Sequence, residues 1–330
     1  MTGAIRNRLH RLWATLDPRM KKHLESDDVV PPRFFTDNNI TLDLATFLPS
    51  DTAADNLNKK PPFLFLIRPE SIVTAHPIIL DDEYFYPGVS GVRDDDPSPA
   101  TQVRMILQEE SKAFHRGTSL AHYIVEWAMR GYPRVLPAGT PNLATFCGIR
   151  SVCSPHPLNT ETRGFERSSG RDTIEWEARI YEYGQRSNGR PVYPHLILLG
   201  VQSCDGHTNS ISLGELTTIV TAMRCRAFQP AAFNSEAILV GDVEQSDDGN
   251  PMPDHEDKLA FPHETRFPVL MVSVVGPQHV RVIYACMDGL TLSIKTSVCR
   301  DIGTDEETVM RYIAGIILSS PLVEIASATR

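Results

Sequence analysis

The chain has 330 residues, of which 41% are hydrophobic and 22% charged, and this composition is typical of an ordinary globular protein. Its formal net charge of −9 argues against general binding to nucleic acids or anionic membranes, because phosphate contacts need a basic surface. No apolar run approaches the roughly 20 residues that span a bilayer. Six scattered cysteines in a long chain without a secretory signal predict thiols rather than a disulfide framework. We therefore expect a protein of the cytosol or the nucleus, and assign it to the cytoplasm.

Residues 1–24 form an arginine-rich, acid-poor amphipathic segment. Its apolar side chains recur at helical spacing, at Ile5, Leu9, Leu12, Trp13 and Leu16. Two interpretations are open. The favoured one is a helix that docks its apolar stripe on the domain. The other is a mitochondrial presequence or a membrane-surface helix, which makes the mitochondrion the alternative location.

Residues 25–160 are expected to be helical and irregular. Short strands are predicted at 63–68, after Pro61-Pro62, and at 72–80, where Pro77 interrupts the strand. Two antiparallel helices are predicted around Val103 to Phe114 and Leu120 to Trp127, because each has apolar residues at helical spacing. The sequence His115-Arg116-Gly117-Thr118 would be the short link between them.

Residues 173–330 are expected to form an antiparallel sheet with covering helices, either as a separate domain or as one domain with the preceding part. The polar stretch 159–172 is the predicted linker or mobile loop before it. Alternation from Thr173 to Tyr183, followed by Asn188-Gly189 and a second apolar run, predicts a hairpin over 173–202. Ser212 and Glu215 form a capping box that opens a helix over about 212–228.

The clearest structural signal is the stretch 267–298, which predicts three antiparallel strands. Asp288-Gly289 is the dipeptide that best tolerates a two-residue type I′ hairpin turn. A last helix is predicted over 304–319, with apolar residues facing inward. Helices first, then antiparallel strands with two covering helices, indicate an α+β fold.

The common nucleotide-binding and catalytic signatures are missing from the sequence. It contains no phosphate-binding Gly-rich loop ending in Lys-Ser/Thr, no GxGxxG after a strand, no GxSxG and no kinase set. Several large enzyme classes thus lose support.

The strongest candidate ligand site is the loop Cys204-Asp205-Gly206-His207, between a buried strand and the capped helix. Loops in this position often hold ligands. Cys204 and His207 also have the spacing of a metal pair, although zinc would need further ligands from elsewhere in the chain. The alternative is a polar turn in which Asp205 and Gly206 shape the backbone.

Two weaker groups contain residue types that can bind metals. Cys147, Cys153 and His156 lack the usual spacing of a structural zinc site. The pairs His255-Glu256 and His263-Glu264 do not complete HExxH. We therefore assign no metal ligand to either group.

Asp288 and Lys295 suggest the strand residues of a nuclease of the restriction-endonuclease type, which needs an acidic residue two positions before the lysine. Ser293 occupies that position, and Asp288 is better explained as a turn residue. This motif is therefore incomplete.

The region from about 193 to 319 contains a strand, a capped helix and then FPVLMVSVVGPQHVRVIYACMDGLTL. It resembles uncharacterised, lineage-restricted proteins of filamentous fungi. The resemblance brings no catalytic residue. It implies a fungal origin, and such proteins sometimes accompany specialised-metabolite pathways.

Two functional hypotheses follow. The first is a binding or interaction protein for a small molecule or a protein, without catalysis. The second is an enzyme of an unfamiliar family, such as a metal-assisted hydrolase or a nuclease-like protein, with its pocket near Cys204, Asp205 and His207. The cofactor, the partner and the oligomeric state are not predicted.

Overall fold

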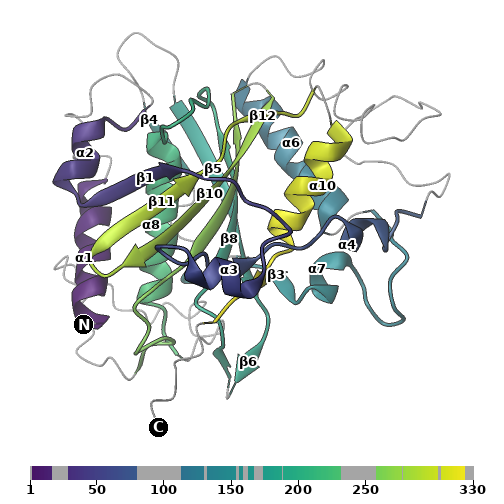
Figure 1. Ribbon diagram of the computed structural model, residues 1–330, viewed down its shortest axis with the longest axis horizontal. Coiled ribbons are helices and arrows are strands. Elements are labelled where there is room, and N and C mark those ends of the chain that lie inside the picture. The colour runs from purple at the N-terminus through teal and green to yellow at the C-terminus, as the bar shows by residue number, and fades with distance from the viewer. Residues whose placement is uncertain are drawn as a thin grey trace, which may run out of the picture.

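The computed structural model describes most of the chain, and Figure 1 shows how its elements are arranged. The described residues are 2–16, 29–79, 113–129, 132–153, 156–158, 163–166, 174–187, 189–231, 258–276, 278–303 and 306–323. A central sheet is packed between two layers of helices, with one hydrophobic core on each of its faces. The predicted α+β class is confirmed.

The central sheet has nine strands within the described residues. These strands are β1 Ile40–Leu44, β3 Ile149–Ser151, β4 Arg163–Glu166, β5 Ile174–Tyr183, β8 Leu196–Gln202, β9 Val269–Val275, β10 His279–Asp288, β11 Thr291–Thr296 and β12 Arg300–Asp301. Seven of them lie in the order β1-β11-β10-β9-β8-β5-β3, while β12 pairs with β10 and β4 pairs with β5. Strands from both sides of the boundary predicted near residue 160 thus share one sheet.

Two strand pairings are parallel, so the sheet is mixed rather than antiparallel as the sequence predicted. β8 pairs with β9 in parallel because a helix carries the chain back across the sheet between them. β1 pairs in parallel with β11, from the other end of the chain. The remaining pairings in this sheet are antiparallel.

The predicted meander over 267–298 is present as β9, β10 and β11. Its last turn differs from the prediction by one residue. Asp288 still pairs with Thr291 in the strands, so the two loop residues are Gly289 and Leu290. Gly289 has φ +59°, and glycine is the residue required at the first loop position of a type II′ turn.

The predicted hairpin over 173–202 is present as β5 and β8. A small second hairpin lies at its tip, formed by β6 Arg186–Ser187 and β7 Arg190–Pro191. The predicted loop 159–172 contains β4, which pairs with β5.

Within the described residues, two long helices cover each face of the sheet, and Figure 1 shows their arrangement. On one face lie α1 Thr2–Thr15 and α8 Leu213–Ala227. On the other lie α6 Ala113–Ala128 and α10 Glu306–Ile317. The two predicted covering helices are therefore present, but on opposite faces. No helix in the described ranges is both long and apolar enough to cross a membrane.

The start of α8 has the predicted capping box. The Ser212 hydroxyl accepts a hydrogen bond from the Glu215 N–H at 3.2 Å, and the Ser212 N–H donates to Glu215 Oε2 at 2.8 Å. These contacts satisfy backbone donors that have no partner inside the helix. The capping box therefore fixes the position of Glu215 in the first turn.

Helix α1 packs along α8 as the docking interpretation describes. Ile5, Leu9 and Leu12 are buried in the core that contains the apolar side chains of α8. Arg6, also buried, donates through Nε to the Ala227 carbonyl at 3.0 Å and through Nη2 to the Phe261 carbonyl at 2.6 Å. The guanidinium thus bonds the end of α8 and the segment before β9.

The prediction of a link between two helices at residues 115–118 is wrong. Residues 115–118, expected to turn, lie inside α6. A Cβ added to Gly117 would lie 2.8 Å from Val201 Cγ1, so this glycine lets α6 approach β8 closely. The predicted first helix lies outside the described residues except at its end.

The predicted strand at 72–80 is also wrong. Residues Ser71–Thr74 form a short helix, α4, and Ile78 makes one isolated bridge with Arg134. The predicted strand at 63–68 is present as β2 Phe65–Leu66, which pairs with β13 Ser320–Pro321. The other short helices among the described residues are α2 Pro32–Asp37, α3 Ala53–Asn58 and α7 Leu143–Phe146.

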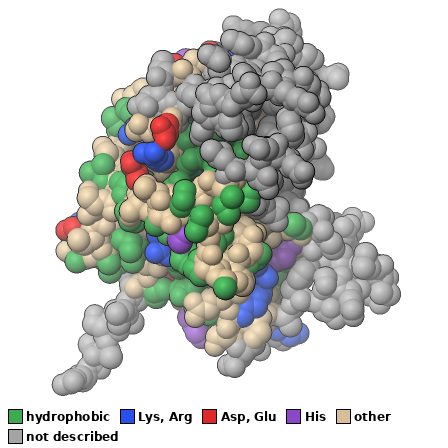
Figure 2. All heavy atoms as spheres, turned by 90° about the vertical axis from the view of Figure 1, so that its right-hand side faces the viewer, with side chains coloured by type: hydrophobic (Ala, Val, Ile, Leu, Met, Phe, Trp, Pro, Cys, Tyr) green, Lys and Arg blue, Asp and Glu red, His purple; other side chains and the backbone are tan. Residues whose placement is uncertain are grey.

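Figure 2 shows the side of the molecule that lies on the right in Figure 1, with α4, α6 and α10. Coloured hydrophobic side chains gather in patches between backbone and other side chains, and charged side chains occur in small separate groups. Among the side chains coloured there, charge is not concentrated at one place.

Candidate functional site

The loop predicted as a ligand site lies where β8 ends and α8 begins, beside the end of β9. The Gly276 N–H donates to the Cys204 carbonyl at 2.7 Å, which joins the loop to the residue after β9. A Cβ on Gly206 would lie 2.7 Å from Cys299 Sγ, and one on Gly276 would lie 2.6 Å from Asp205 Oδ1. The loop is therefore packed closely against its neighbours.

The three predicted ligand residues lie in this one loop but in different environments. Cys204 is buried, whereas Asp205 and His207 are exposed. The backbone carbonyl of His207 accepts a hydrogen bond from the Ser210 hydroxyl at 2.8 Å. Within the described ranges, no group of three or more His, Cys, Asp or Glu side chains could hold a metal ion.

A buried ion pair lies beneath this loop. Arg281 of β10 donates through Nε to Glu215 Oε1 at 2.8 Å, and its Nη2 contacts the other carboxylate oxygen. Arg281 Nη1 donates to the carbonyls of His207 at 2.9 Å and Ser210 at 3.0 Å. The pair therefore holds the loop, α8 and β10 together.

The charges of this pair stabilise each other. Burial raises the pKa of Glu215, but the Arg281 charge and the hydrogen bonds to the carboxylate outweigh it, so the net shift is downward. Burial lowers the pKa of Arg281, and the Glu215 charge more than reverses this. Both groups stay ionised and bonded to each other, which is a structural role.

The group Cys147, Cys153 and His156 does not form a site either. Cys147 is half-buried, and burial raises the pKa of its thiol, while Cys153 is exposed. His156 Nδ1 accepts a hydrogen bond from the Leu158 N–H at 3.2 Å.

Of the two His-Glu pairs considered as ligands, the structure describes the second, His263-Glu264. His255 and Glu256 lie outside the described residues. Glu264 uses Oε1 to accept hydrogen bonds from the N–H groups of Thr265 at 2.8 Å and Arg266 at 2.7 Å, so it shapes the local backbone.

Asp288 and Lys295 lie toward opposite ends of the β10–β11 pair. Asp288 pairs with Thr291 at the turn, whereas Lys295 pairs with Tyr284 farther along. Lys295 Nζ donates to the Pro61 carbonyl at 3.1 Å, and burial, aided by the charge of Lys59, lowers its pKa. These residues therefore form no common site.

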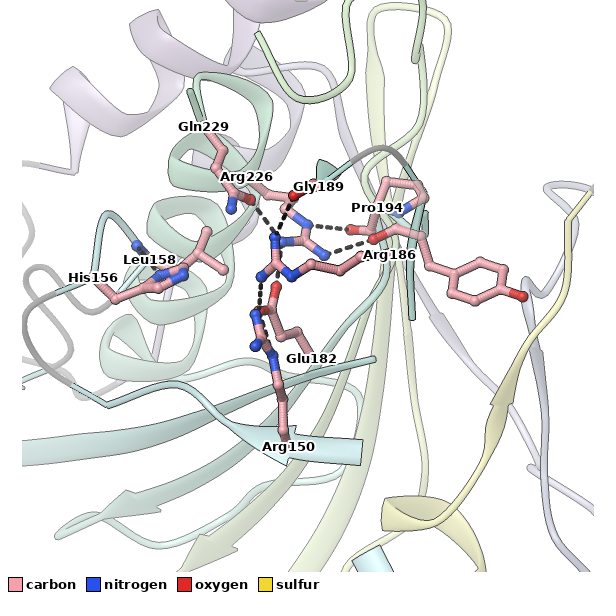
Figure 3. Close-up of polar contacts among 10 residues, drawn as sticks. Arg150, His156, Leu158, Glu182, Arg186, Gly189, Pro194, Arg226 and Gln229 are labelled. Atoms are coloured by element: carbon pink, nitrogen blue, oxygen red, sulfur yellow. Dashed lines mark hydrogen bonds and ion pairs between the residues drawn. The ribbon is translucent and has the colours of Figure 1, made fainter. Parts of the chain in front are cut away.

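A group of charged side chains that the sequence analysis missed lies at the other end of α8 (Figure 3). We call it the arginine cluster: Arg150 of β3, Arg186 of β6, Arg226 in the last turn of α8, and Glu182 of β5. Figure 3 shows the three guanidinium groups gathered around the Glu182 carboxylate. Glu182 Oε2 accepts from Arg226 Nη1 at 2.7 Å. Oε1 accepts from Arg150 Nε at 2.9 Å, from Arg150 Nη2, and from Arg186 Nη2 at 3.4 Å.

The arginine cluster runs from the interior to the surface. The side chains of Arg226 and Glu182 are 0% and 1% exposed, whereas those of Arg150 and Arg186 are 44% and 33% exposed. Arg226 is held by the Pro194 and Tyr193 carbonyls at 3.3 and 2.5 Å and by Gln229 Oε1 at 2.6 Å. The buried pair Glu182 and Arg226 thus supports two half-exposed cations.

Burial has the largest effect on the pKa values of Arg226 and of its neighbour His156, and the charges of the cluster modify it. Burial lowers the pKa of Arg226, an effect that Glu182 opposes and Arg150 reinforces. The pKa of the nearby His156 is also lowered, first by burial and then by Arg150 and Arg226, against the opposing charge of Glu182. The charges therefore act on one another through a poorly solvated region.

One sequence signal could have indicated the arginine cluster. Trp176, Ala178 and Ile180 are buried at alternate positions of β5, and Glu182 continues the same series. A carboxylate at an apolar register position needs a buried cationic partner. The identity of that partner could not be read, because Arg226 lies 44 residues away in the sequence.

Comparisons with known proteins identify no relative: no family model, no curated protein and no solved structure matches the chain.

Proposed function

We propose that this chain is a cytoplasmic binding or interaction protein without catalysis, and that the half-exposed side of the arginine cluster binds an anionic ligand. The observation that supports the proposal most is the pair Arg150 and Arg186, two half-exposed side chains that both donate to Glu182 Oε1. All six cysteines carry thiol groups, which suits a reducing compartment.

The chemistry of the cluster favours binding over catalysis. A guanidinium stays protonated in proteins, so it recognises anions well and transfers protons poorly. The buried acids Glu182 and Glu215 are each bonded to arginine, so both carboxylates are already engaged by the protein. An accessory role beside a specialised-metabolite pathway, implied by the fungal resemblance, is part of this proposal.

The alternative is a metal-assisted hydrolase or a nuclease-like enzyme at the loop of Cys204, Asp205 and His207. The closeness of this loop to the ends of two parallel strands favours that position for a site, because ligands often bind there in α/β sheets. The different exposure of its three side chains weighs against convergent chemistry.

A single experiment separates the two functions. Purified protein is incubated with small carboxylates and phosphates, with and without added divalent cations. Ligand-observed NMR reports binding, and spectra taken over hours report turnover. We expect binding of at least one anion, weakened in Arg150→Gln, and no new product.

Two results would overturn the proposal. One is an absence of anion binding by the wild-type protein. The other is conversion of a compound at a rate abolished in an Asp205→Ala/His207→Ala variant, which would establish the enzyme instead. Because both exposed side chains can be shortened without opening the core, this variant should still fold.

A further inference from the structure

The arginine cluster has an excess of positive charge. Three guanidinium groups surround one carboxylate, so the four side chains have a formal charge of +2. Within the described ranges, Glu182 is the acid that bonds these arginines. Cations in a half-buried position are costly unless they are compensated, because burial removes part of their hydration.

The hydrogen bonds of the cluster leave donors at its outer side. Arg226 uses all three of its nitrogens on Pro194, Tyr193, Glu182 and Gln229. By contrast, Arg150 Nη1 and Arg186 Nε bond to no residue in the part of the chain that the structure describes. Unused N–H groups therefore occur on the two half-exposed side chains.

These two side chains are already positioned. Glu182 Oε1 holds Arg150 through two nitrogens, and Arg186 is held by Glu182 and by the Gly189 carbonyl at 3.3 Å. Fixing long side chains before binding reduces the entropy that a ligand must overcome. The fork of a guanidinium also matches the oxygens of a phosphate group.

We propose that Arg150 and Arg186 bind the dianionic phosphate group of a small phosphomonoester, with Glu182 and Arg226 as positioning residues. The charge decides between anions: a dianion compensates the whole excess of +2, whereas a monocarboxylate compensates half of it. This inference rests on the proposed function, because it names the chemical class of ligand at the same surface.

The test is isothermal titration calorimetry at constant ionic strength, with inorganic phosphate, glucose 6-phosphate, sulfate and acetate as probes. We expect the first three to bind at one site, with acetate at least tenfold weaker. Arg150→Gln and Arg186→Gln should each weaken phosphate binding by roughly 10- to 100-fold, because each removes a charged hydrogen bond. Arg311→Gln is the matched control, since Arg311 is a half-exposed arginine of α10 paired with Glu307.

The Glu182–Arg226 pair remains in both cluster variants, and their thermal unfolding shows whether each is folded. Equal binding of acetate and phosphate would overturn the inference, as would phosphate binding that neither substitution weakens. If carboxylates bind in an Arg150-dependent manner and phosphate does not, the phosphate assignment fails while the anion-binding function stands. If no anion binds, both fail.

Discussion

Arg281 and Glu215 form a buried ion pair that joins the centre of the sheet to the first turn of α8, with Arg281 Nε 2.8 Å from Glu215 Oε1. The side chains are 1% and 0% exposed. The same guanidinium bonds two carbonyls of the loop that precedes α8. One side chain therefore connects three segments of the chain.

Removing one partner of this pair should destabilise the protein strongly. Glu215→Gln or Arg281→Met leaves a buried charge without compensation, which typically costs about 3–5 kcal/mol. Urea denaturation gives the free energy of unfolding. Arg311→Met, which removes a surface ion pair with Glu307, should cost only about 0.3–0.5 kcal/mol. Costs below 1 kcal/mol for both buried variants would contradict this role.

The docking of α1 predicts a stabilising helix. Leu9→Ala should lower the free energy of unfolding by about 2–5 kcal/mol, because Leu9 is fully buried in the core shared with α8. Arg11→Ala is the control on the exposed side of the same helix and should change it by less than about 0.5 kcal/mol. Similar effects of the two substitutions in chemical denaturation would argue against docking in solution.

Gly117 should tolerate alanine poorly even though it lies in a helix. Alanine normally stabilises a helix by about 1 kcal/mol relative to glycine. Here the new Cβ would lie 2.8 Å from Val201 Cγ1, so we expect a net loss of about 1–3 kcal/mol. The free energy of unfolding from urea titrations measures this loss.

The clash at Gly117 should be relieved by shortening its neighbour. In a Val201→Ala background, Gly117→Ala should cost much less, and a double-mutant cycle measures the difference. Gly315→Ala provides the contrast, because its Cβ would lie 2.5 Å from the Arg68 backbone carbonyl, which no side-chain substitution removes. An unchanged cost of Gly117→Ala in the Val201→Ala background would contradict the packing explanation.

His195 makes stability depend on pH. Burial lowers the pKa of His195 to about 3, and its Nε2 lies 3.1 Å from the Leu322 carbonyl. Between about pH 6.5 and 3 the unfolded chain therefore binds one more proton at this residue than the folded chain. Stability due to His195 is complete above pH 6.5 and falls on acidification, by about 2 kcal/mol between pH 7.5 and 5.

His195→Leu should remove this share of the acid sensitivity. The comparison is the change in unfolding free energy from pH 7.5 to 5 in the variant and in the wild type. The pKa values of His10 and His156 are also lowered, in each case first by burial. Both histidines are present in the variant and in the wild type, so the difference between the two proteins isolates His195. Identical pH dependence in the two proteins would mean that His195 is not buried as a neutral ring.

Local patterns in the sequence predicted much of this fold. Runs of β-branched residues and the alternation of apolar and polar residues predicted β9, β10 and the β5–β8 pair. Ser212 and Glu215 predicted the start of α8. These signals are local, because strand alternation and helix capping act over a few residues.

Features that depend on distant segments were not predictable in this way. Nothing local in Ile40–Leu44 indicates a parallel partner at Thr291–Thr296. Gly117 was interpreted as a turn residue because the close approach of Val201 is a tertiary effect. The arginine cluster combines residues from four separate elements, so only the apolar register of Glu182 pointed toward it.

The parallel pairing of β1 with β11 has a consequence for synthesis of the chain. β1 ends at Leu44, whereas its partner begins at Thr291, so β1 emerges from the ribosome long before β11 exists. At roughly 5–20 residues per second, this delay is on the order of 10–50 s. During that time the apolar side of β1 has no sheet to join, and we expect a chaperone to bind it. Stalled nascent chains that end before Thr291 should be protease-sensitive at residues 40–44, and full-length chains should be protected there.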